Sequence, residues 1–103
     1  MYGLLERDFK FILKAICGYP EIEEVIIFGS RAMGNYKKGS DIDLALKGEK
    51  VDQRVVRRLS DELEEEYPLP YFFDIVNYND ITEEELKHHI DSVGKTIWRK
   101  KAS

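Results

Sequence analysis

The sequence predicts an α/β domain of the α+β kind, with helices packed on a small mixed β-sheet of three to four strands. Three segments repeat apolar residues at helical spacing, and several short runs have the composition of strands. Between residues 41 and 77 a strand, a helix and a strand follow one another, an order that favours parallel strands joined by a right-handed crossover. We expect the 103 residues to form a single domain, residues 1–103.

Two amphipathic segments predict the first two helices. The first spans Tyr2 to Cys17, carries apolar side chains along one face and ends at Gly18, and we expect it to cover one face of the sheet. Cys17 is the only cysteine, and we expect it to be a small buried apolar residue. The second helix spans about Asp52 to Tyr67, and the prolines that follow stop it.

A third helix is predicted near the C-terminus. Residues Thr82 to Glu85 have the pattern of a capping box that starts a helix, and Gly94 is expected to end it. His88 and His89 are adjacent on this helix and cannot share one face as metal ligands, so we expect both on the solvent side. Beyond it, residues 96–98 are expected to run extended against an edge of the sheet.

Three runs predict the main strands. The run Val25 to Phe28 is short, apolar and rich in β-branched residues, and a Gly-Ser pair ends it. In the run Asp41 to Leu46, acidic and apolar residues alternate at the strand period of two. The run Tyr71 to Asn77 is apolar and aromatic. A short return connects the first strand to the second, so we expect these two strands to be antiparallel.

Asp41 and Asp43 lie two residues apart at the start of the second predicted strand. The strand period puts both carboxylates on one face and the apolar residues on the other, namely Ile42, Leu44 and Leu46. Like charges about 7 Å apart on a strand disfavour folding unless a cation lies between them. Oxygen ligands select a hard cation such as Mg²⁺. The spacing therefore predicts a magnesium site, and the simpler alternative is a solvated strand edge.

The end of the first predicted strand indicates a phosphate site. Gly29 lets the backbone approach a ligand closely, and Ser30 and the backbone N–H groups beside it can donate hydrogen bonds to phosphate oxygens. Arg31 follows directly, and we expect it to contact phosphate or a partner. A phosphate cradle joined by a short loop to a carboxylate pair indicates a site for a metal-bound nucleoside triphosphate.

Asp74 is the one charge inside the third predicted strand. A carboxylate in such a run is unfavourable when buried without a partner, so its presence indicates a nearby cation. The expected topology brings Asp74, the earlier carboxylates and the Gly-Ser turn to the same end of the sheet. Asp74 is then a metal ligand or a general base, two roles that remain open. The alternative is an edge-strand charge that faces solvent.

The frame GSRAMGNYKKGSDIDLAL contains Gly29, Ser30, Asp41 and Asp43. It resembles the signature of the DNA polymerase β-like nucleotidyltransferase superfamily, and most of all its minimal nucleotidyltransferase (MNT) branch. Asp74 in FFDIV matches the later acidic residue of that signature. The resemblance implies a nucleotidyltransferase fold, with the three aspartates catalytic and binding Mg²⁺. Two ions, about 3.5–4 Å apart, are the expected cofactor.

The resemblance also implies a biological role. Members of the MNT branch are commonly antitoxins paired with a HEPN-domain ribonuclease toxin, and some transfer AMP from ATP to a tyrosine of that toxin. We therefore expect two partners, a HEPN-domain protein and a nucleoside triphosphate, ATP or another. One alternative is a catalytically silent antitoxin that neutralises its partner by binding. Another is transfer to a small molecule such as an aminoglycoside, which the absence of an acceptor domain disfavours.

The composition excludes other classes. A formal net charge of −4 and a pI near 5.2 argue against a general nucleic-acid binder, which usually has a basic surface. Charged residues near the N-terminus stand where a signal peptide needs an apolar core. No run approaches the ~20 apolar residues of a membrane span. We expect a cytoplasmic protein without membrane contact.

Overall fold

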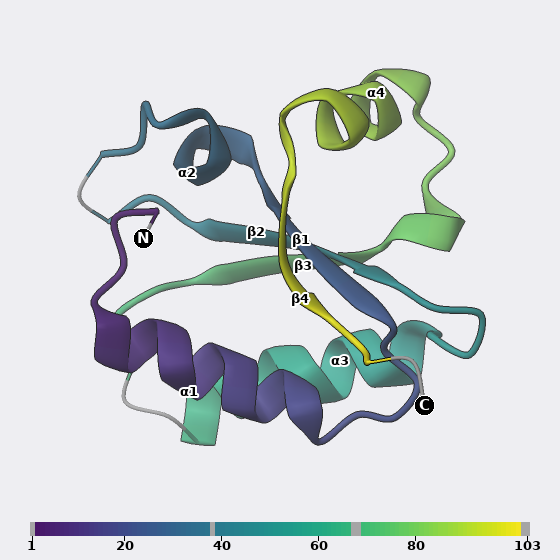
Figure 1. The fold of residues 1–103 in the computed structure, drawn as a ribbon, viewed down its shortest axis with the longest axis horizontal. Coiled ribbons are helices and arrows are strands. Elements are labelled where there is room, and N and C mark those ends of the chain that lie inside the picture. The colour runs from purple at the N-terminus through teal and green to yellow at the C-terminus, as the bar shows by residue number, and fades with distance from the viewer. Residues whose placement is uncertain (1, 38, 67–68, 102–103) are drawn as a thin grey trace.

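A computed structural model describes residues 2–37, 39–66 and 69–101. A four-stranded sheet forms its centre, in the order β3-β2-β1-β4 (Figure 1). The strands are β1 (Glu24–Phe28), β2 (Ile42–Lys47), β3 (Phe73–Asn77) and β4 (Lys95–Arg99). The mixed sheet with helices packed on it confirms the predicted fold class.

Helices lie on both faces of this sheet. Helices α1 and α3 cover one face, and α2 and α4 lie on the other (Figure 1). Their bounds are α1 (Glu6–Cys17), α2 (Gly29–Met33), α3 (Gln53–Asp61) and α4 (Glu84–Val93). A π-helical turn, Glu62–Glu66, continues α3, and a 3-10 turn, Tyr78–Asp80, follows β3. Within the described ranges, no helix has the length and apolarity needed to span a bilayer.

Strand pairing follows the predicted topology. Strands β1 and β2 are antiparallel, with Phe28 opposite Asp43. Strands β2 and β3 are parallel, with Asp43 beside Asp74, and α3 lies in the crossover between them. The segment expected to run extended is β4, which pairs antiparallel with β1 and shifts register between Val25 and Ile26.

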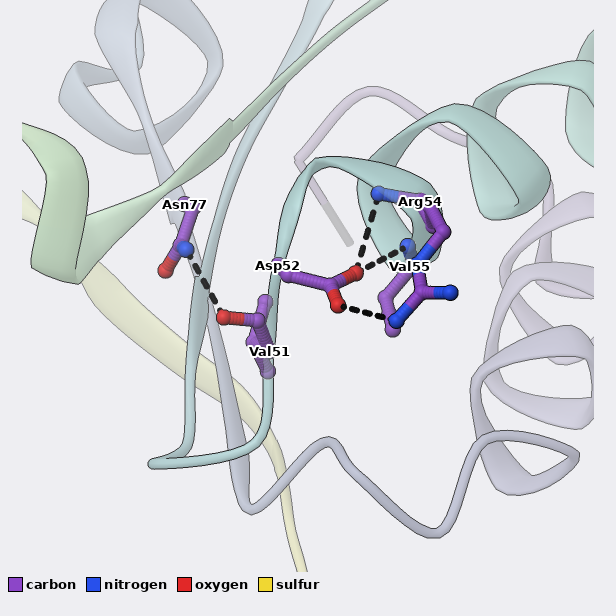
Figure 2. Close-up of polar contacts among 5 residues, drawn as sticks. All are labelled: Val51, Asp52, Arg54, Val55 and Asn77. Atoms are coloured by element: carbon purple, nitrogen blue, oxygen red, sulfur yellow. Dashed lines mark hydrogen bonds and ion pairs between the residues drawn. The ribbon is translucent and has the colours of Figure 1, made fainter.

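Polar contacts hold the β2–α3–β3 crossover (Figure 2). Asp52 caps α3, because its Oδ1 accepts hydrogen bonds from the backbone N–H groups of Arg54 (2.9 Å) and Val55 (3.1 Å). Buried Asn77, at the end of β3, donates from Nδ2 to the carbonyl oxygen of Val51 at 2.9 Å. This bond ties the end of β3 to the start of the crossover, and so helps to keep the parallel register.

The α1/α3 face holds the larger apolar core. Its fully buried side chains from the strands are Val25, Ile27, Ile42, Leu44 and Leu46. The opposite face buries a smaller cluster, consisting of Ile26, Phe28, Ala45 and Ile90. Because successive strand residues point to opposite faces, the β2 alternation leaves Asp43 and its register partner Asp74 on the α2/α4 face.

The first helix differs from the prediction at its start and in the burial of its last residue. Helix α1 begins at Glu6 rather than at residue 2, and Cys17 is exposed, so its expected burial was wrong. Ile16 takes the buried position, and the next residue of a helix points about 100° away from it. Helix α3 ends at Asp61 and is continued only by the π-helical turn. The predicted end at Tyr67 lies outside the described residues.

The predicted capping box does not form. Helix α4 begins at Glu84, and its N-cap residue, Glu83, makes no side-chain capping hydrogen bond. Ile81 packs against the smaller core, and the chain stays extended through Glu83, with φ −79° and ψ 114°. Thr82 is therefore too early in the chain to cap the helix. The predicted end at Gly94 is confirmed.

Candidate active site

Asp43 and Asp74 lie next to each other across the parallel strands β2 and β3. Residues in register on neighbouring strands point to the same face, about 5 Å apart. Asp41 immediately precedes β2. Asp43 is half-buried, whereas Asp41 and Asp74 are exposed. The three predicted carboxylates thus belong to one end of the sheet, on its α2/α4 face.

The carboxylates repel one another. Burial and then the nearby charges of Asp74 and Asp41 raise the pKa of the Asp43 carboxyl from 3.8 to about 6. The positive charge of Arg31 acts in the opposite direction but does not cancel the rise. The folded chain therefore holds a negative charge at Asp43 less readily than the unfolded chain does.

Gly29 lies directly against Asp43. Its backbone φ of +72° lies in the left-handed region, and a Cβ atom at this position would overlap the Asp43 Oδ2 atom. Both features favour glycine. The close approach brings the Gly29 amide and the neighbouring Ser30 to the end of the sheet where the carboxylates lie.

Arg31 is buried and bonded to backbone carbonyl oxygens, which its sequence context did not indicate. The side chain is 2% exposed, and its guanidinium lies near the rings of Tyr36 and Tyr71, 5.4 and 5.2 Å from their centroids. It donates to the carbonyl oxygen of Ser40 from Nε (3.1 Å) and Nη2 (2.8 Å), and to that of Tyr2 from Nη1 (2.9 Å). Arg31 thus ties the loop that leads into β2 to the N-terminal segment, and a phosphate contact by Arg31 stays a prediction.

His89 belongs to the site, and its predicted solvent-side position was wrong. The Gly29 N–H donates a hydrogen bond to His89 Nε2 at 3.1 Å, and the imidazole packs edge-on against Phe28, with ring centroids 6.1 Å apart. Its neighbour His88 is exposed, as expected. In the sequence, His89 is three residues after the inner-face residue Leu86, which places it at the boundary between the two faces of the helix.

The donor set fits a hard cation. Across residues 2–37, 39–66 and 69–101, no group of three or more His, Cys, Asp or Glu side chains is arranged to hold a metal ion. Mg²⁺ does not need such a cage, because it binds one or two carboxylates and completes its shell with water and substrate phosphates. A divalent cation at the carboxylates would relieve the part of the Asp43 pKa rise that comes from their mutual repulsion, while the larger part comes from burial.

A cleft of about 520 Å³ opens beside the site rather than at the carboxylates. Its walls include Leu5, Arg31, Tyr36 and Tyr71, and none of the three aspartates lines it. The cleft and the three aspartates are therefore separate features, and Arg31 lines the cleft.

Carboxylates from two parallel strands, set against the turn that ends an antiparallel neighbour, are the arrangement of a nucleotidyltransferase domain. A family model described as polymerase beta, nucleotidyltransferase matches residues 10–103, and the chain belongs to that family. Nucleotidyltransferases of this type generally use divalent metal ions. A search of curated protein sequences gives no significant match.

Several solved structures share the fold. A toxin–antitoxin complex with AMP-PNP contains a chain that aligns at TM-score 0.71 and 23% identity, over 95% of this chain and 76% of that chain. A complex of tri-AMPylated Shewanella oneidensis HEPN toxin with MNT antitoxin aligns at TM-score 0.69 and 20% identity, over 97% and 74%. The toxin–antitoxin pair MntA–HepT aligns at TM-score 0.69 and 20% identity, over 93% and 74%.

Proposed function

We propose that the chain is a Mg²⁺-dependent nucleotidyltransferase that transfers AMP from ATP to a tyrosine hydroxyl of a HEPN-domain toxin, and so acts as its antitoxin. The observation that carries the proposal is the adjacency of Asp43, Asp74 and Gly29 at one end of the sheet. Family membership supports the transferase chemistry. The structures of similar fold support the partner and the nucleotide, since one holds AMP-PNP and another an AMPylated HEPN toxin.

The chain's own residues supply a place for the metal and for the phosphates. Asp41, Asp43 and Asp74 are the residues that would hold Mg²⁺, with two ions expected. Bound there, the metal neutralises charge on the triphosphate and stabilises the attacking and leaving oxygens. The Gly29 amide and the Ser30 hydroxyl donate hydrogen bonds to the β- and γ-phosphate oxygens.

The reaction is a displacement at the α-phosphorus. Asp74, exposed on β3, accepts the proton of the acceptor hydroxyl. The hydroxyl oxygen forms a bond to the α-phosphorus, the bond from that phosphorus to the bridging oxygen breaks, and pyrophosphate leaves. Arg31 acts as a positioning residue, because its bonds to Ser40 hold the loop that leads to the carboxylates.

The test is the intact mass of a HEPN-domain protein that is co-expressed with this chain. We expect the wild-type chain to add one or more AMP units to a tyrosine of the partner. The double variant Asp41→Asn, Asp43→Asn should add none, while Asp61→Asn, an exposed carboxylate on α3, should behave as wild type. A stable complex with no mass change would instead identify a silent antitoxin that acts by binding.

A further inference from the structure

The contact between His89 and Gly29 occupies the amide group to which the proposed function assigns a phosphate. Gly29 donates its N–H to His89 Nε2 at 3.1 Å. Nε2 is therefore the unprotonated ring nitrogen, and in the neutral imidazole Nδ1 carries the hydrogen. A phosphate oxygen that accepts the same N–H must take the position now held by Nε2.

The residues around His89 hold its ring near the Gly29 N–H, where a phosphate oxygen would bind. The imidazole is half-buried and packs edge-on against Phe28. The next residue of α4, Ile90, is 1% exposed and anchors the helix in the smaller core. The contacts with Phe28 and Gly29 place the imidazole next to the Gly29 amide, and buried Ile90 holds the helix at this position. A phosphate oxygen bound at that amide would therefore lie beside the ring.

We propose that His89 is a phosphate-contacting residue of the nucleotide site, donating a ring N–H to a β- or γ-phosphate oxygen once the triphosphate replaces it at Gly29. This inference rests on the proposed function. A neutral imidazole can place its single hydrogen on either nitrogen, so the change from acceptor to donor needs only a change of tautomer. Helix α4 thereby contributes to substrate binding as well as to the fold.

Loss of the His89 side chain can strengthen or weaken triphosphate binding, depending on which is stronger: its hydrogen bond with Gly29 or its hydrogen bond with phosphate. Removing the imidazole frees the Gly29 amide, which favours phosphate by the net value of one neutral hydrogen bond. It also removes a bond to a charged phosphate, and charge-assisted hydrogen bonds are roughly twice as strong as neutral ones. The loss exceeds the gain. We therefore expect His89→Ala to bind the triphosphate about three- to tenfold more weakly than wild type.

The experiment is isothermal titration calorimetry of the full chain with Mg²⁺, using AMP-PNP and, separately, inorganic triphosphate. His88→Ala is the matched control, since His88 is the adjacent exposed histidine on the same helix. His89→Gln keeps an amide that can donate or accept near the position of Nε2. A thermal melt without ligand checks that each variant is folded.

We expect weaker binding of both ligands to His89→Ala, wild-type binding to His88→Ala and substantial rescue in His89→Gln. The effect should persist with inorganic triphosphate, because the contact is to phosphate and not to the base. Equal or tighter binding by His89→Ala, with wild type binding normally, would overturn the role of His89 alone. If wild type bound neither ligand, the proposed nucleotide site would fail and the inference with it.

Discussion

The two faces of the sheet differ in what they bury. The α1/α3 face packs a continuous apolar core from both helices and three strands, in which Ile27, Leu44 and Leu46 are fully buried. The α2/α4 face buries a smaller apolar cluster, and beside it lie half-buried Asp43 and half-buried His89. Burial of apolar surface is the main favourable term in folding. The first face therefore carries most of the stability, which leaves the second free to hold groups that oppose folding.

Substitutions at two neighbouring residues of β1 should give the largest difference in stability between the two faces. Ile27 points into the larger core and is fully buried, whereas Ile26 belongs to the smaller cluster and is 7% exposed. We expect Ile27→Ala to lower the free energy of unfolding by about 3–5 kcal/mol, and Ile26→Ala by about 2–3 kcal/mol. Urea unfolding of both variants measures the difference. Equal losses would show that the two faces stabilise the fold alike.

Two glycines separate backbone strain from contact with the site. Gly34 has φ +86° and open space where a Cβ atom would lie, whereas Gly29 has φ +72° and lies against Asp43. Gly34→Ala should cost about 1–2 kcal/mol for the left-handed backbone. Gly29→Ala should cost roughly 2–4 kcal/mol, because overlap with Asp43 adds to the strain. In an Asp43→Ala background, thermal melts should show similar destabilisation by Gly29→Ala and Gly34→Ala. If Gly29→Ala remained more destabilising, overlap with Asp43 would not be the cause.

The smallest expected effect is a pH dependence of the free energy of unfolding, which arises from Asp43 on the α2/α4 face. The pKa of Asp43 is about 6 in the folded chain against an ordinary 3.8. From about pH 4 to pH 6 the unfolded chain loses this proton while the folded chain keeps it, so stability falls as the pH rises. Above the folded pKa the full penalty applies, about 1–2 kcal/mol after allowance for solvent screening.

Urea unfolding in EDTA at about pH 4 and pH 7, for wild type and Asp43→Asn, measures this penalty. Wild type should lose more stability than the variant between the two values. Added Mg²⁺ should narrow the gap at pH 7, because a cation at the carboxylates relieves the repulsion. If wild type and Asp43→Asn lost equal stability between the two pH values in EDTA, the raised pKa of Asp43 would be contradicted.

Local periodicity was enough to predict the sheet and the position of its carboxylates. The alternation from Asp41 to Leu46 separates core and site faces, and burial of Ile42, Leu44 and Leu46 confirms that separation. The crossover rule gave the parallel β2–β3 pair, and therefore the adjacency of Asp43 and Asp74. Both inferences depend only on residues close in sequence and on chain handedness.

Features that depend on distant contacts were not predicted. Arg31 is buried because Ser40 and Tyr2 offer it carbonyl oxygens, and nothing in the local sequence indicates that pairing. His89 reaches Gly29 across 60 residues of sequence. The helical pattern of α4 placed Leu86 and Ile90 inward but did not decide the side of a residue at the boundary between its two faces. Such residues are assigned only once the packing of the helix on the sheet is known.

If the proposed function holds, the position of β3 at the edge of the sheet affects how an acceptor reaches Asp74. Asp74 is exposed on this outermost strand, and Phe72, just before the strand, is 74% exposed. Asp74 lines neither the cleft beside the site nor the cleft formed by residues 64–65 and 69–72. A side-chain hydroxyl on the surface of a docked, folded protein could therefore approach Asp74 from the edge of the sheet without entering a cavity. Molecular size does not bar an acceptor from this edge.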